Sequence, residues 1–164
     1  MIIVREMLAI VLINGSSMTP TLQSGERVLA WTPFSKRLFK RGNIVTLRHF
    51  PIRLTDKQRS QPRYRAAVAV IERDPPEILI KRLVGLPGDT VRVSLAQLSS
   101  HALTTVDPQA IRQGDNLLWH VSAGHVFVRG DGQVSNDSVA WGSIPFAKLN
   151  QIVLCRFPSF QRIS

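Results

Sequence analysis

Short apolar runs separated by turn-forming residues follow one another along this chain of 164 residues. Val, Ile and Thr recur in these runs, and such residues favour strands over helices. Ten glycines and ten prolines strengthen this tendency, because both residues break strands with turns. The pattern predicts an all-β protein with strands at residues 7–13, 27–31, 43–48, 66–72, 77–84, 90–95, 117–121, 125–128 and 152–157.

Two polar stretches interrupt this pattern. Residues 51–65 are basic and contain Pro51 and Pro62, which predicts an exposed loop insertion. Residues 96–116 are a second, variable insertion whose secondary structure the pattern does not define. The sequence Asp74-Pro75-Pro76 separates two apolar runs and favours a hairpin-like connection between them. A chain of this length suits one domain, so we expect a single domain over residues 1–164.

The positive charge is concentrated in one region. The formal net charge is +10, and residues 36–65 hold ten Lys or Arg side chains against the single acid Asp56. Such a segment can bind an anionic membrane surface, at roughly 1 kcal/mol per basic residue, and a solvated loop is the plain alternative. We expect no nucleic-acid partner, because aromatic residues are not interleaved with the charges and no nucleic-acid-binding motif is present.

The apolar run at residues 7–13 is too short to cross a membrane. A spanning helix needs about 20 apolar residues, and this run has seven, preceded by Arg5 and Glu6. It is also a poor signal peptide, because cleavage after it would fall beside the serines discussed next. We interpret it as a strand that leads into Ser16 and Ser17.

A serine and a lysine stand out as candidate chemistry. Ser17 lies in the turn-rich stretch Asn14-Gly15-Ser16-Ser17-Met18-Thr19-Pro20-Thr21-Leu22, directly after an apolar run. Lys81 lies within an apolar run, with Leu79 and Ile80 before it. A serine needs a base to become a good nucleophile, and a lysine can be that base only if burial lowers its pKa. The two residues are therefore a candidate Ser-Lys dyad.

Three sequence boxes resemble the type I signal peptidases, a family of membrane-associated Ser-Lys proteases. The first is the Ser-Met-Thr-Pro-Thr box at 17–21, and the second is Lys-Arg-Leu-Val-Gly-Leu-Pro-Gly-Asp at 81–89. The third runs from Gly130-Asp131 through Ser135-Asn136-Asp137-Ser138 to Gly142, and a linking box, Arg-Gly-Asn-Ile-Val, occupies 41–45. Each box alone is a modest signal, but all of them occur in the family's order.

The resemblance implies a fold and a role for each box. It implies coiled antiparallel β-sheets, with Ser17 as nucleophile and Lys81 as general base. It also implies that the Ser17 N–H forms part of an oxyanion hole with Ser16 beside it, and that Asp137 and Ser138 support the lysine region. Arg82 follows Lys81 on the strand, so it should point the other way and serve structure.

This sequence departs from the family pattern at two positions. Many bacterial members carry a side-chain hydroxyl two residues before the nucleophile, where this chain has Gly15, as mitochondrial-type members do. An Arg often follows the Asp-Ser pair, where this chain has Val139. The family cleaves after small residues, so shallow apolar pockets are expected beside the dyad, lined by Ile13, Met18, Leu22 and Ile80.

The resemblance favours a serine endopeptidase that removes N-terminal leader segments without any cofactor. It could be a bacterial leader peptidase, an organelle inner-membrane peptidase subunit or a protease that matures a nickel superoxide dismutase. A degenerate member that acts as a binding subunit, or a self-cleaving Ser-Lys repressor, are the alternatives. The resemblance implies membrane association at the extracytoplasmic face, or a cytoplasmic location for the dismutase type. The four histidines show no metal-ligand spacing, so no metal site is expected.

Overall fold

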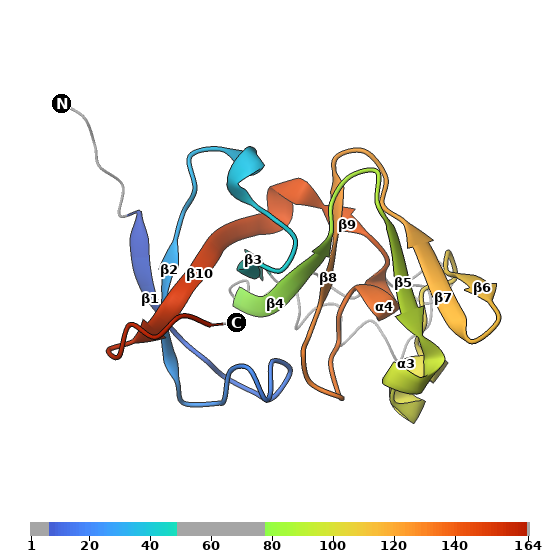
Figure 1. The fold of residues 1–164 in the computed structure, drawn as a ribbon, viewed down its shortest axis with the longest axis horizontal. Helices are drawn as coiled ribbons and strands as arrows, with labels where there is room; N and C mark the ends of the chain where they lie inside the picture. The colour runs from blue at the N-terminus through green and yellow to red at the C-terminus, as the bar shows by residue number, and fades with distance from the viewer. Residues whose placement is uncertain (1–6, 49–77, 164) are drawn as a thin grey trace, which may run out of the picture.

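A curled antiparallel sheet of seven strands forms most of the protein (Figure 1). The computed structural model describes residues 7–48 and 78–163. The strand order is β1-β2-β10-β3-β4-β8-β9, so the chain's last long strand lies between two of its first. These strands are β1 (Leu8–Leu12), β2 (Arg27–Trp31), β10 (Leu149–Phe157), β3 (Ile44–Arg48), β4 (Ile78–Gly85), β8 (His125–Arg129) and β9 (Ile144–Pro145).

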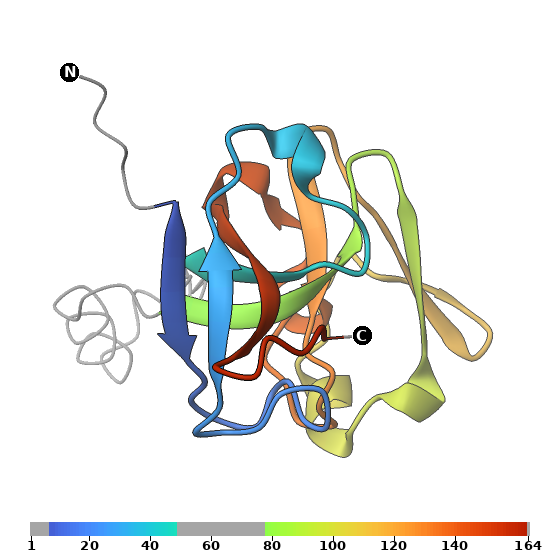
Figure 2. The ribbon, with the colours of Figure 1, turned by 60° about the vertical axis from the view of Figure 1, so that its left-hand side comes forward.

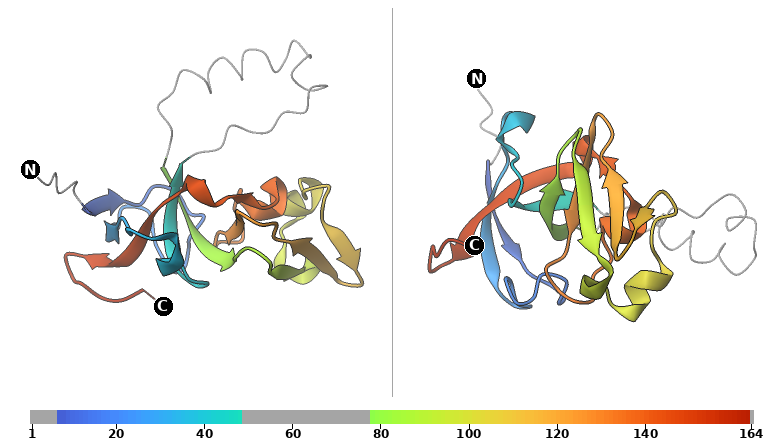
Figure 3. Two further views of the ribbon diagram at one scale, coloured as in Figure 1. Left: turned by 90° about the horizontal axis from the view of Figure 1, so that it is seen from above. Right: turned by 45° about the vertical axis from the view of Figure 1, so that its right-hand side comes forward.

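A smaller sheet of three strands follows β4 in the chain. Its order is β5-β7-β6, built from β5 (Thr90–Ser94), β7 (Asn116–His120) and β6 (Ile111–Gln113). Short helices join the strands: α3 (Ser100–Thr104), α4 (Ser138–Trp141), and the 3-10 turns Lys36–Leu38, Leu95–Gln97 and Phe146–Lys148. Figures 2 and 3 show β1 and the β6–β7 hairpin at opposite ends of the molecule.

The alternation of buried and exposed positions explains why these runs become strands. In β4, Lys81, Leu83 and Gly85 are buried, while the residues between them are half-buried. Side chains of a strand point alternately to its two faces, so one face of β4 lines the interior. Gly85 is required there, because a β-carbon would lie 2.5 Å from Val91 and 3.0 Å from Phe127. This glycine lets the small sheet pack closely on β4 and β8.

The buried apolar side chains form three clusters. One lies between β3, β4, β8 and β10, around Val45, Leu47 and Leu83. A second lies beneath the loop between β1 and β2, and a third joins β8 to the small sheet through Phe127 and Trp119. The rings of Phe127 and Trp119 are 5.1 Å apart, centre to centre. The second cluster supports the loop that carries Ser17, and the third includes Val139, next to Ser138.

The predicted all-β fold is confirmed. The strands expected at 27–31, 43–48, 77–84, 90–95, 117–121 and 125–128 coincide with β2, β3, β4, β5, β7 and β8 to within one residue at each end. The run at 7–13 forms β1, and the last strand begins three residues before the predicted start. The variable insertion at 96–116 contains α3 and β6, which the pattern did not reveal. The basic loop at 51–65, the expected strand at 66–72 and its hairpin-like connection lie outside the described residues.

Within the described part of the chain, no helix is long and apolar enough to cross a membrane.

Candidate active site

The loop between β1 and β2 carries Ser17 at the edge of the second cluster. The loop closes on itself through hydrogen bonds from Ile13 N to Glu26 O, at 2.8 Å, and from Gly25 N to Ile13 O, at 2.9 Å. Met18 and Leu22 are 2% and 0% exposed, so they fix the loop to the core on either side of its tip. Ser16 is exposed and Ser17 is half-buried. The loop therefore presents Ser17 at a boundary between core and solvent.

Lys81 lies on the buried face of β4. It pairs with Val45 of β3 in the antiparallel ladder, and its side chain is 3% exposed. Lysine side chains are almost never buried to this degree without a partner or a function. Burial lowers the pKa of Lys81 below its ordinary value, and the negative charge of Asp137 offsets only part of that effect. The neutral amine is therefore favoured more than in water.

The fold brings these two side chains together across 64 positions of sequence. Lys81 Nζ donates a hydrogen bond to Ser17 Oγ at 2.6 Å. At the same distance between nitrogen and oxygen, a neutral amine could accept the hydroxyl proton, because it carries a lone pair as well as N–H donors. The arrangement has the reach that a general base needs toward a nucleophile.

Asp137, whose charge acts on Lys81, and Ser138 are tied to the backbone. Asp137 caps α4: its Oδ1 accepts from Val139 N at 3.0 Å, and its Oδ2 accepts from Gly130 N at 2.9 Å. Ser138 is fully buried, and its Oγ accepts from Val128 N at 3.0 Å. These bonds join the start of α4 to the end of β8. They hold the Asp137 carboxylate near the lysine amine.

The loop after β8 holds the nucleophile from the other side. Gly132 N donates to the carbonyl oxygen of Ser17 at 2.9 Å. A β-carbon at Gly132 would lie 2.6 Å from the carbonyl oxygen of Ser16, and one at Gly130 would overlap the carbonyl oxygen of Ser17. Both positions therefore need glycine for a close approach of two backbones. The sequence box contained these glycines, but only the fold reveals what they touch.

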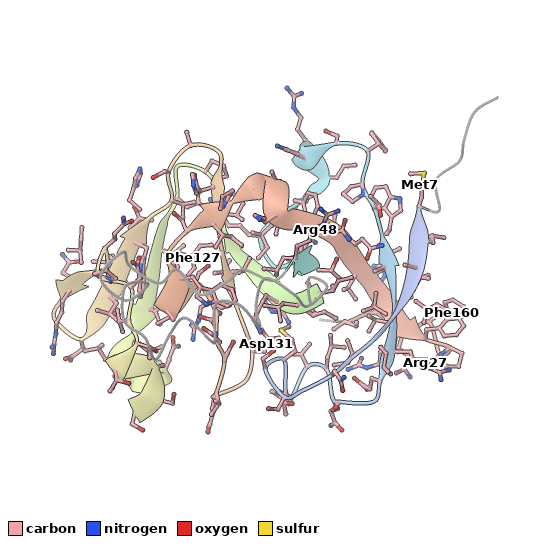
Figure 4. All side chains as sticks on the ribbon, turned by 180° about the vertical axis from the view of Figure 1, so that it is seen from behind. Met7, Arg27, Arg48, Phe127, Asp131 and Phe160 are labelled. Carbon is pink, nitrogen blue, oxygen red and sulfur yellow. The ribbon has the colours of Figure 1, made fainter. Side chains whose placement is uncertain are left out.

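An ion pair joins the lysine strand to this same loop. Arg82 binds Asp131 in bidentate fashion, with Nε to Oδ1 at 2.9 Å and Nη2 to Oδ2 at 2.7 Å. Its Nη1 donates to Gly42 O at 2.9 Å. Burial acts to raise the pKa of Asp131, but the hydrogen bonds from Arg82 and Thr21 and the positive charges of Arg82 and Arg129 together outweigh it, and the pKa is lowered. Figure 4 labels Asp131 beside the loop between β1 and β2, and Thr21 of that loop also bonds it.

This geometry agrees with the comparisons of the sequence. A profile described as signal peptidase, peptidase S26, matches residues 1–157. The chain belongs to this family. The mitochondrial ATP-independent inner membrane protease subunit 1b of Arabidopsis thaliana is 29% identical over 150 residues, covering 90% of this chain and 68% of that protein. Signal peptidase I U of Bacillus subtilis (strain 168) is 28% identical over 141 residues, covering 76% of this chain and 61% of that protein.

Membership of the signal peptidase family confirms the resemblance seen in the sequence boxes and supports a peptidase of the signal-peptidase type. The chain spans about two thirds of the length of the two relatives. The catalytic roles of Ser17 and Lys81 stay predictions, although their side chains are in contact.

The structure gives a physical reason for one departure from the family pattern. Gly15 has φ +91°, in the left-handed region where residues with a β-carbon are strained. Its N–H lies 3.4 Å from Ser24 Oγ. A serine or threonine at this position would need a different loop path, so this backbone conformation fits the absence of a side-chain hydroxyl. At the other departure, Val139 is 4% exposed and packs in the third cluster, where an arginine would have to be buried.

The side chains expected to line substrate pockets lie together in the second cluster. Ile13 is 4% exposed, and Met18 and Leu22 are buried more completely. Ile80 is half-buried at the edge of the same cluster. Of the four, Ile80 therefore offers the most accessible surface beside Lys81, and the pocket assignment stays a prediction.

Neither His120 nor His125 takes part in this site. His120 is exposed at the end of β7, and His125 Nδ1 is 3.0 Å from the carbonyl oxygen of Ala123. Among residues 7–48 and 78–163, no three His, Cys, Asp or Glu side chains are grouped so that they could hold a metal ion.

Proposed function

We propose that this protein is a serine endopeptidase of the signal peptidase I type that uses Ser17 and Lys81 as its catalytic dyad. The observation that carries the proposal is the 2.6 Å contact between Lys81 Nζ and Ser17 Oγ, made by a lysine that is 3% exposed. A structural lysine would place its ammonium in water. This one is enclosed beside a hydroxyl, and burial lowers its pKa.

The reaction begins with transfer of the Ser17 hydroxyl proton to the neutral amine of Lys81. The Ser17 oxygen attacks the scissile carbonyl carbon, and the developing oxyanion accepts a hydrogen bond from the Ser17 N–H. Lys81 then gives its proton to the leaving amine, and an acyl group remains on Ser17. Lys81 next takes a proton from a water molecule, whose oxygen attacks the acyl carbonyl; as the bond to Ser17 breaks, Lys81 returns that proton to the Ser17 oxygen. Every proton step uses the same amine, so no cofactor is needed.

The proposed substrates are proteins with N-terminal leader segments that are cut after a small residue. Substrate side chains would occupy shallow apolar surface near Ile80, at the accessible edge of the second cluster. We further propose that the basic segment 36–65 associates with an anionic membrane surface. Its described part, residues 36–48, places Lys36, Arg37, Lys40, Arg41 and Arg48 on exposed positions.

Cleavage of a leader peptide by purified variants tests the dyad. Ser17→Ala and Lys81→Ala should each abolish cleavage, and the double variant should lose little more than either single one, because the two groups act as a unit. Lys40→Ala is the matched control: its side chain is exposed, and its bonds with Asn43 are made by its backbone N–H and C=O. Near-normal cleavage by Lys81→Ala would refute the dyad.

The same assay separates the alternatives. A degenerate family member that serves as a binding subunit would show no cleavage with the unmodified chain, and Gly15 and Val139 are the positions that raise this possibility. A self-cleaving protease would process its own chain in preference to an added peptide. Cleavage of the peptide in trans, lost in both single variants, supports the endopeptidase.

A further inference from the structure

A cavity beside β4 and β5 is lined by three arginines. Its volume is about 430 Å³, and its walls come from β4, β5, the end of β8 and the turn before β3. Val84 of β4 is one of the lining residues, and it lies between the buried residues Leu83 and Gly85 in the strand. The charged residues of the lining are Arg41, Arg92, Arg129 and Asp89.

The carboxylate in this cavity is already engaged. Asp89 Oδ2 accepts from Arg41 Nε at 2.6 Å and from Leu86 N at 2.7 Å, and its other oxygen binds a second nitrogen of Arg41. Hydrogen bonding to Arg41 lowers the pKa of Asp89, so the pair is fully ionised at neutral pH. Neither Arg92 nor Arg129 forms an ion pair within the described parts of the chain. The lining therefore carries a net charge of about +2.

Arg129 is placed in an unfavourable position for an unliganded cation. It lies directly opposite Arg82 in the ladder between β4 and β8, and like charges in such a pair repel. Asp131 forms its ion pair with Arg82 and acts on Arg129 only through longer-range charge. The Nε of Arg129 is buried, and no atom of the described residues accepts a hydrogen bond from it. A buried donor on a charged group is costly when it lacks an acceptor.

We propose that this cavity binds a phosphate group, held by Arg129 and Arg92 with Arg41 at the rim. Guanidinium groups bind phosphate oxygens in a forked geometry, and several around one anion are typical of phosphate recognition. The phosphate would supply the acceptor for the buried Nε and neutralise the two unpaired guanidiniums. This site is separate from the proposed protease chemistry, since neither Ser17 nor Lys81 lines it and its β4 residue, Val84, alternates with Lys81, Leu83 and Gly85.

Calorimetric titration of the full chain with inorganic phosphate, at ionic strength held constant with chloride, tests the site. Saturable binding of one phosphate is expected. Arg129→Gln and Arg92→Gln should each weaken it by about tenfold or more, as expected for loss of a charge-assisted hydrogen bond. Arg92 is exposed, so Arg92→Gln should fold normally. It therefore tests the site even if Arg129→Gln does not fold. Arg112→Gln is the control, because Arg112 is exposed on β6 and does not line the cavity.

Vesicles distinguish the source of the phosphate group. Binding to phosphatidylcholine vesicles that contain phosphatidate is compared with binding to pure phosphatidylcholine. If Arg92→Gln weakens the first more than Arg112→Gln does, the site takes a lipid headgroup. If only the phosphate titration depends on Arg92, it takes a free phosphate. Absence of saturable phosphate binding, or an equal loss in Arg92→Gln and Arg112→Gln, would overturn the proposal.

Discussion

Replacing Gly132 with alanine should disable the active site without unfolding the protein. The added β-carbon would lie 2.6 Å from the carbonyl oxygen of Ser16 and 3.2 Å from the carbonyl carbon and oxygen of Ser17. These neighbours are backbone atoms, which cannot rotate away as a flexible side chain can. The φ of Gly132 is not in the left-handed region, so the contact is the main obstacle to alanine.

The size of the displacement follows from these distances. Ordinary contact begins at 3.4 Å, so the two loops must separate by about 0.8 Å. The Ser17 carbonyl receives its bond from Gly132 N, and Ser17 Oγ lies 2.6 Å from Lys81 Nζ, so the displacement is passed to the nucleophile. Misplacement of a reacting group by roughly 1 Å costs on the order of 100-fold in rate. We therefore expect kcat/KM for a leader peptide to fall about 50-fold, or roughly 2.3 kcal/mol.

Two control variants separate displacement from general destabilisation. Gln133→Ala changes the exposed neighbour of Gly132 and should leave kcat/KM unchanged. Gly124→Ala puts strain at φ +73° on the β7–β8 turn, where the β-carbon meets open space. It should therefore lower the melting temperature but not the activity at a temperature where the protein is folded. If Gly132→Ala stays within about threefold of Gln133→Ala in kcat/KM, the loop after β8 does not position Ser17.

Three further outcomes follow from the charged groups of the site. Because burial lowers the pKa of Lys81, kcat/KM should rise with pH through a midpoint below the ordinary lysine value of about 10.4, and a flat profile would point to another base. Lys81→Met should unfold at a higher urea concentration than the parent at neutral pH. In the parent, the Lys81 amine is protonated more readily in the unfolded chain than in the buried site, and this stabilises the unfolded state. That gain should shrink as pH rises toward the unfolded-state pKa, and a less stable Lys81→Met would contradict it. Arg82→Lys should lose about 2 kcal/mol of stability, and some activity, because lysine cannot form the fork to Asp131; Arg41→Lys, at an exposed pair, should change little.

The sequence by itself determined the class of fold and singled out Ser17 and Lys81 as a candidate dyad. A short apolar run after a turn is a local property of the sequence, and it placed β2 at the residues it occupies. The boxes around Ser17 and Lys81 identified the family, because each box carries residue types that the family uses in a fixed order.

The insertion at 96–116 could not be predicted in the same way. α3 is a single short turn capped by Ser99, and β6 is three exposed residues paired with β7. Neither has an apolar period long enough to recognise. They form because β7 and the third cluster offer partners, which are set by the tertiary structure.

Only the tertiary structure decided the protonation tendency of Lys81 and the fit around Ser17. A lysine between apolar neighbours could equally place its ammonium in water. It is buried because β3 and β8 flank β4 and the loop between β1 and β2 closes over its side chain. In the same way, Gly132 and Arg129 are ordinary residues in the sequence. Gly132 touches the loop that carries Ser17, more than 100 residues earlier in the chain. Arg129 lines the arginine-rich cavity together with Arg41, more than 80 residues earlier.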